Sequence, residues 1–253
     1  MGGLSRRFVK MNELRDSGVD PLIIDAGDLF FSTANLNSKN KKSELYRAGA
    51  ILEGYNRVGC DAINVGHYEM LNGLSFLKSM EEKTEIPFLS ANLRDSQTNK
   101  LLFEPFRIIE KESLKIGIVG VTDKLPDTTK SMIADNYIEA GNHYIDEVSK
   151  QADIIVIMVN SNRKTYSELP TLFANADIIV TSGSTNMTRE NTAQKENGPF
   201  LYSCGKQGKY MSVLSVEMED KKAPIIDVSS HEKNISSIRK RFERLQKKDP
   251  NKS

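Results

Sequence analysis

The sequence has few of the residues that usually mark a disulfide framework, a histidine-rich site or a membrane span. Its 253 residues include two cysteines, three histidines and no tryptophan. Two cysteines cannot build a disulfide framework, and we interpret Cys60 and Cys204 as buried free thiols. The longest apolar runs, such as residues 153–159, are far shorter than the roughly 20 residues that a membrane-spanning helix needs. The sequence therefore predicts no transmembrane segment.

A strong net charge is also missing, because 35 Lys and Arg nearly balance 34 Asp and Glu and leave a formal charge of +1. No global field points to nucleic acid, and basic and aromatic residues do not interleave as they do in single-strand binders. Residues 1–15 contain arginines but lack the apolar core and the cleavage site of a signal peptide. Two interpretations stay open: the protein is cytoplasmic, or the chain begins after a removed segment.

What the sequence does contain is a regular alternation of apolar runs and amphipathic segments. Apolar residues at every third or fourth position predict helices, and continuous apolar runs predict buried strands. The predicted helices are 4–14, 43–59, 73–83, 134–151 and 164–175, and polar loops are expected at 33–43 and 186–198. The predicted strands are 21–27, 61–66, 86–93, two within 103–123, 153–159, 176–183, 198–205, 209–219 and 223–230. This order is typical of a layered α/β fold, and the late run of strands indicates a second, antiparallel sheet edge.

The end of the chain has a different, basic character. Four apolar residues recur there at helical spacing among six Lys and Arg, namely Ile235, Ile238, Phe242 and Leu245. We therefore divide the chain into a domain over 1–230 and a basic amphipathic helix with its tail over 231–253. Either this helix docks on the domain through its apolar residues, or it binds an acidic surface.

Small or polar residues follow the ends of several predicted strands. Asp28 follows the first strand in "DAGDLFF", and His67 and Glu69 follow the second in "VGHYE". Asn160 ends a later strand, and residues 183–185 follow the next one. In α/β sheets, functional groups collect where the strands end and the loops begin. We therefore expect these side chains to converge on one pocket.

The same segments resemble the 5'-nucleotidase branch of the calcineurin-like metallophosphoesterases. The resemblance is carried, in family order up to about residue 219, by "GGLSRR…ELR", "IIDAGDLFFST", "GCDAINVGHYEM", "FLSANL", "KIGIVGVTD", "ADIIVIMVNSN", "ADIIVTSGSTN" and "YSCGKQGKYMSVLSVEME". It implies a four-layer αββα sandwich with a two-metal site at the strand ends, in a family that is often periplasmic or extracellular. It also implies that the chain lacks the family's first strand, whose Asp-x-His motif would supply two ligands. An open sheet edge, with unpaired backbone groups, is then expected beside residues 21–27.

The resemblance further implies a site in which most metal ligands are replaced. Asp28 matches the metal-bridging aspartate, and Glu69 matches the family's glutamate. His67 stands where the family has a ligand asparagine, and Tyr68 replaces the histidine that acts on the leaving group. Three further ligand histidines are replaced by Asn160, Gly183 and Thr185. Gly66 is expected to keep the turn of this loop, because glycine tolerates positive φ and close backbone approach.

These replacements favour a non-catalytic binding or scaffold relative that needs no cofactor. Two divalent ions about 4 Å apart need several carboxylate and imidazole ligands to offset their repulsion, and Asn160 offers only a neutral amide. Asp28 and Glu69 would then hydrogen-bond loop backbone, and Tyr68 would pack. Its partners would be a protein, or a missing upstream strand and C-terminal domain. The other two histidines, His143 and His231, match no family ligand, and we expect both at the surface.

Two further hypotheses remain open. The chain could be an active phosphoester hydrolase that holds one Mn, Zn, Fe, Ca or Mg ion on Asp28, His67 and Asn160. It could also be an incomplete gene product that lacks the first strand and the second domain, which in full-length relatives supplies the nucleotide-stacking contacts. Metal binding distinguishes the hydrolase from the non-catalytic relative.

Overall fold

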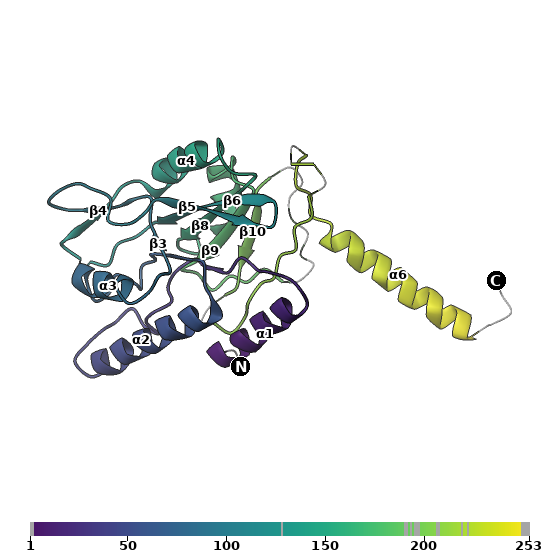
Figure 1. The fold of residues 1–253 in the computed structure, drawn as a ribbon, viewed down its shortest axis with the longest axis horizontal. Coiled ribbons are helices and arrows are strands. Elements are labelled where there is room, and N and C mark those ends of the chain that lie inside the picture. The colour runs from purple at the N-terminus through teal and green to yellow at the C-terminus, as the bar shows by residue number, and fades with distance from the viewer. Residues whose placement is uncertain are drawn as a thin grey trace.

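The computed structural model describes residues 3–248, except 128, 190, 191, 193, 195–197, 206, 207, 219 and 222. Part of the predicted loop 186–198 thus lies outside the described residues. The described chain forms a sandwich in which helices cover the outer faces of two facing sheets (Figure 1). The predicted α/β layers are therefore present.

The first sheet is small and parallel. Its strands, in spatial order, are β1 (Ile24–Asp25), β2 (Ala62–Asn64) and β3 (Phe88–Leu89). Its cover consists of α2 (Lys41–Val58), α3 (Leu74–Glu81) and α1 (Leu4–Asp16), which packs on α2. Leu52 of α2 and Leu77 of α3 are buried in one apolar cluster with Ile63 and Phe88. This burial fixes the helices on the outer face of the sheet.

The second sheet has five strands and supplies most of the regular pairing. In spatial order they are β10 (Phe200–Ser203), β9 (Ile178–Ser182), β8 (Ile154–Asn160), β6 (Leu114–Thr122) and β5 (Phe106–Lys111). Only β5 and β6 pair in antiparallel fashion, and the other pairs are parallel. Its outer face is covered by α4 (Tyr137–Val148), the 3-10 turn η1 (Tyr166–Glu168) and α5 (Leu169–Leu172). A separate antiparallel pair joins β4 (Leu93–Asp95) and β7 (Met132–Ala134).

Alternate residues of β8 face two different cores. Ile155 and Ile157 pack with the helices on the outer face, whereas Met158 faces the first sheet and packs with Ala62 and Leu89. A strand buried on both faces has a continuous apolar sequence, as residues 154–159 do. The space between the sheets is therefore a third apolar core, in which residues of the two sheets pack against each other.

Two predicted strands, 209–219 and 223–230, are not regular strands where the structure describes them. Val216, Met218 and Ile225 instead pack on an apolar cluster of the second sheet without joining its ladder. Apolar spacing reports burial and does not by itself report strand pairing. The expected late antiparallel edge was also wrong, because β10 runs parallel to β9 and the antiparallel edge is β5. The predicted helix over 164–175 is reduced to two short turns.

The edge of the first sheet beside β1 is open among the described residues. β1 pairs only with β2 and has no second neighbour there. This agrees with the open edge expected next to residues 21–27.

The C-terminal helix α6 (Ser229–Lys248) extends away from the sandwich (Figure 1). Its apolar residues are 50% to 67% exposed, so the expectation that they dock on the domain was wrong. Among the described helices, none combines the length and the apolar character that crossing a bilayer requires. Of the two free thiols, Cys60 is buried as expected, but Cys204 is only half-buried.

Candidate functional site

The predicted site residues meet at one end of the sandwich. Asp28, His67, Tyr68, Asn160 and Gly183 line a pocket of about 200 Å³. They come from the loops after β1 and β2, from the end of β8 and from the loop after β9. The strand ends therefore converge as the sequence predicted. Of the two other predicted residues, Glu69 lies buried against the loop of Asp28, and Thr185 is exposed outside the lining of this pocket.

Two glycines let the loops after β1 and β2 approach each other closely. A Cβ atom on Gly27 would lie 2.8 Å from the backbone N of Gly66, and one on Gly66 would lie 2.8 Å from the backbone N of Asp28. Side chains at either position would collide with backbone. The positive φ expected at Gly66 occurs instead at Gly27 (98°) and at Asp28 (62°). At Gly66, the absence of a side chain serves only to let the two loops approach each other closely.

The carboxyl group of Glu69 ties these two loops together. It accepts backbone N–H groups from Asp28 (2.8 Å), Leu29 (2.6 Å), Phe30 (3.1 Å) and Gly66 (2.9 Å), two on each oxygen. Successive N–H groups around a left-handed residue form a concave nest that suits an acidic group. Glu69 is fully buried. Burial raises its pKa to about 8, with the Asp28 carboxylate adding to the shift and the N–H groups opposing it.

Asp28 faces the pocket from the opposite side of this turn. Its carboxylate accepts the backbone N–H of Tyr68 at 2.9 Å. Burial raises the pKa of Asp28, while this N–H and the amide of Asn160 act against the shift. Tyr68 is half-buried, and burial together with Asp28 raises its pKa as well. Proton donation by a phenol with a raised pKa is unfavourable near neutral pH.

His67 has a fixed ring orientation. Its Nδ1 lies 3.1 Å from the backbone carbonyl of Lys124, which is only an acceptor, so Nδ1 carries the proton. In the neutral ring Nε2 is then the nitrogen with the lone pair. Nε2 is therefore the nitrogen through which a neutral His67 would bind a metal ion or accept a proton.

Asn160 links three strand ends through its amide. Its Oδ1 accepts the backbone N–H of His67 at 2.9 Å, and its Nδ2 donates to the hydroxyl of Ser182 at 2.7 Å. The Ser182 hydroxyl donates in turn to the carbonyl of Ala26 at 2.6 Å. The chain of hydrogen bonds crosses from the second sheet to the first. Asn160 is 3% exposed, so both ends of its amide serve this link in a nearly water-free setting.

Four residues outside the predicted set also line the pocket, namely Asp123, Lys124, Ser161 and Asn162. Asp123 and Ser161 follow the ends of β6 and β8, and Asn162 donates to Asp123 at 3.0 Å. The Ser161 hydroxyl is buried and has no hydrogen-bond partner among the described atoms. The rule that places functional groups at strand ends could have found Asp123, since "KIGIVGVTD" ends in it. His143 and His231 are exposed, as expected.

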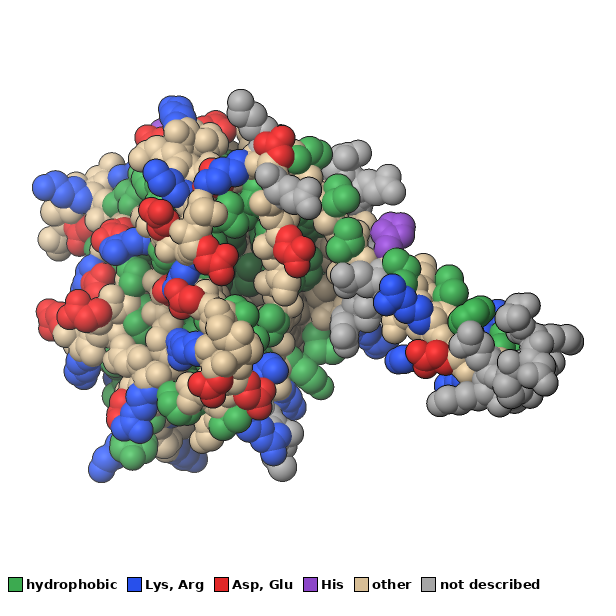
Figure 2. All heavy atoms as spheres, turned by 45° about the vertical axis from the view of Figure 1, so that its right-hand side comes forward, with side chains coloured by type: hydrophobic (Ala, Val, Ile, Leu, Met, Phe, Trp, Pro, Cys, Tyr) green, Lys and Arg blue, Asp and Glu red, His purple; other side chains and the backbone are tan. Residues whose placement is uncertain are grey.

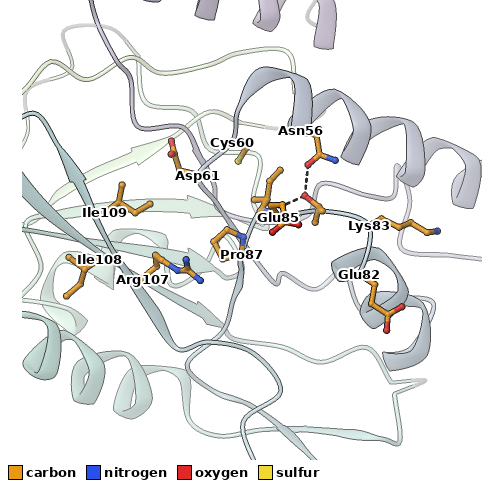
Figure 3. Close-up of a pocket in the computed structure, with 12 residues that line it drawn as sticks. Asn56, Cys60, Asp61, Glu82, Lys83, Glu85, Pro87, Arg107, Ile108 and Ile109 are labelled. Atoms are coloured by element: carbon orange, nitrogen blue, oxygen red, sulfur yellow. Dashed lines mark hydrogen bonds between the residues drawn. The ribbon is translucent and has the colours of Figure 1, made fainter.

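A larger cleft of about 870 Å³ lies at the opposite end of the first sheet (Figure 3). It opens where β2 and β3 begin, beside β5, and its rim mixes acidic and basic side chains, among them Asp61, Glu85, Lys83 and Arg107. The Thr84 hydroxyl donates a hydrogen bond to the side-chain oxygen of Asn56, which joins the segment before β3 to α2 at the side of this cleft. The candidate site is the smaller pocket, because the predicted carboxylate, imidazole and amide side chains gather there. In the described part of the chain, no group of three or more His, Cys, Asp and Glu side chains is arranged to hold a metal ion.

Comparison with known proteins gives relatives for the sandwich and its strand-end loops. No protein-family model matches the chain. A 5'-nucleotidase of Vibrio cholerae is 33% identical over 132 residues, which are 51% of this chain and 22% of the relative. A snake venom 5'-nucleotidase of Naja atra is 28% identical over 251 residues, which are 87% of this chain and 45% of the relative. The chain is thus similar to part of these 5'-nucleotidases, in agreement with the resemblance stated from the sequence.

A solved structure supports the same fold for this 5'-nucleotidase relative. The calcineurin-like phosphoesterase YfkN of Bacillus subtilis has a TM-score of 0.63 at 20% identity, over 82% of this chain and 74% of that one. The resemblance and the sandwich fold inferred from the sequence are thereby confirmed. The chain spans less than half the length of these two 5'-nucleotidases.

Proposed function

We propose that this 5'-nucleotidase relative is a non-catalytic domain that serves as a binding or scaffold unit. One observation carries the proposal: where the family has a ligand histidine, the amide of Asn160 already holds His67 and Ser182 in place. Both carboxyl oxygens of Glu69 likewise accept hydrogen bonds from backbone N–H groups of the loop after β1. The polar groups of the former site now connect its loops.

The donor set does not fit a pair of divalent ions. Gly183 has φ 81°, and a Cβ there would lie 2.5 Å from the carbonyl of Ser161, so this backbone leaves no room for an imidazole. Thr185 is exposed and outside the lining of the pocket. Two carboxylates, Asp28 and Asp123, and one imidazole remain, which is fewer than a two-metal site needs.

One observation favours the competing hydrolase. Asp28, Asp123 and His67 line the same pocket, and Nε2 of His67 carries the lone pair. As the described side chains stand, these three groups are not arranged to hold an ion, so binding even one ion would require them to move closer together. The second lone pair of the Asn160 Oδ1 would then offer a further, neutral ligand. Metal binding therefore decides between the two proposals.

Titrating Mn²⁺ or Zn²⁺ into the full chain in a calorimeter is expected to give the same small heats for the wild type and for Asp28→Asn. The substitution keeps the shape of the side chain and removes its charge, so it abolishes any binding that depends on Asp28. Asp95→Asn, at an exposed carboxylate whose oxygen accepts N–H groups of its own turn, serves as the matched control. Saturable binding to the wild type that is lost in Asp28→Asn and kept in Asp95→Asn would contradict the proposal.

A further inference from the structure

The helix α6 carries an apolar stripe that the described part of the domain leaves uncovered. At 3.6 residues per turn, its four apolar residues fall within an arc of about 80°. They are Ile235 (50% exposed), Ile238 (67%), Phe242 (60%) and Leu245 (57%). Figure 2 shows the helix standing out from the body with apolar and basic side chains on its surface. An exposed apolar stripe on a helix about 30 Å long indicates a binding surface for another molecule or for a membrane.

The charge of α6 is opposite in sign to that of the rest of the chain. Seven of the 35 Lys and Arg lie on residues 229–248, but only two of the 34 Asp and Glu do, so the helix carries +5 and the remainder of the chain −4. Arg239 and Arg241 border the apolar stripe on its two sides, and Lys240 and Arg244 lie on the opposite face. A basic helix favours an anionic occupant, and the acidic body is not that occupant in this structure, since it leaves the apolar stripe exposed.

A second copy of the helix is a poor occupant. The stripe has the spacing of a coiled-coil seam, but it covers only about two heptads, and stable coiled coils need three or four. Arg239 and Arg241 would occupy the flanking positions in both helices, where they would place like charges together. The attraction between apolar seams would therefore be opposed by the arginines.

We propose that α6 binds the surface of an anionic lipid bilayer. The stripe would enter the boundary between headgroups and acyl chains, and Arg239 and Arg241 would reach the phosphates on either side. A long helix with Phe, Leu and Ile on a narrow face, Lys and Arg on the other and low mean hydropathy lies in the interface and does not cross the bilayer. The inference does not depend on whether the candidate pocket is catalytic.

The test measures co-sedimentation of the full chain with vesicles, since the chain has no tryptophan for fluorescence. We expect binding to vesicles containing phosphatidylglycerol and none to pure phosphatidylcholine, with weaker binding at high salt. Arg239→Glu combined with Arg241→Glu should lower the partition coefficient at least tenfold, because each basic residue near an anionic surface contributes about fivefold. Ile238→Ser combined with Phe242→Ser should lower it by a similar factor, because apolar burial is lost.

The matched control is Lys41→Glu combined with Lys42→Glu, which makes the same change of charge at two exposed residues of α2. It should keep wild-type binding to within about twofold, since a charge on the body makes no contact with the bilayer. Circular dichroism confirms that each variant is folded. The proposal fails if phosphatidylglycerol vesicles do not bind the chain, or if the control loses as much binding as the α6 variants. It also fails if sedimentation velocity shows a dimer that Phe242→Ser abolishes, because the stripe is then covered by a second copy.

Discussion

Replacing Glu69 with alanine is expected to lower the free energy of unfolding by about 4 kcal/mol, because four backbone N–H groups lose their shared acceptor. A buried donor left without a partner costs on the order of 1–3 kcal/mol, and water entering the vacated space recovers part of the total. Urea denaturation followed by circular dichroism measures this change.

Glu110→Ala is the matched control for this prediction. Glu110 is an exposed residue of β5, where the same truncation removes no buried acceptor, and its cost should stay within about 0.5 kcal/mol. If both substitutions cost the same, Glu69 does not hold the two loops, and the structural role assigned to it is wrong.

Gly27→Ala is expected to lower the free energy of unfolding by about 3 kcal/mol or more. Two effects add at this position. An alanine at φ 98° is strained, by about 1–2 kcal/mol, and its Cβ would lie 2.8–2.9 Å from the backbone of Asn64 and Gly66. Overpacking against backbone that cannot move aside costs a further 1–3 kcal/mol, approximately. Denaturant unfolding again gives the value.

Gly18→Ala separates the two effects. Gly18 has φ 87°, and a Cβ on it would meet no atom within 4 Å, so only the strain applies and a cost of about 1 kcal/mol is expected. Equal costs at Gly18 and Gly27 would mean that the close approach of the loops after β1 and β2 contributes nothing to stability.

The apolar pattern of the sequence predicted the buried parallel strands well. It gave wrong strands where apolar residues pack on a sheet without joining its hydrogen-bonded ladder. The run 154–159 is apolar at every position because both faces of β8 are buried. Residues 209–218 have comparable spacing, yet Val216 and Met218 pack on the second sheet without joining it. The sandwich was inferred in part from that late run of strands. The conclusion held, although the antiparallel edge lies at β5.

The convergence of the site could be predicted, but the present use of its residues could not. Parallel strands place Asp28, His67 and Asn160 at one edge whatever these side chains do there. The hydrogen bond from His67 to Asn160 joins residues 93 positions apart, and no local pattern encodes it. The collision that a side chain at Gly183 would make with the carbonyl of Ser161 is likewise a property of the folded backbone.

The rate of phosphoester hydrolysis, measured with nucleoside monophosphates and p-nitrophenyl phosphate in the presence of Mn²⁺ or Zn²⁺, tests the non-catalytic proposal most directly. We expect no metal-dependent turnover in the wild type, and none in Asn160→His, because restoring one imidazole leaves the other ligands absent and breaks the link to His67 and Ser182. Asp28→Ala sets the background rate. A metal-dependent turnover above about 1 s⁻¹, the low end of typical enzyme rates, that disappears in Asp28→Ala would contradict the proposal and establish an altered-site hydrolase.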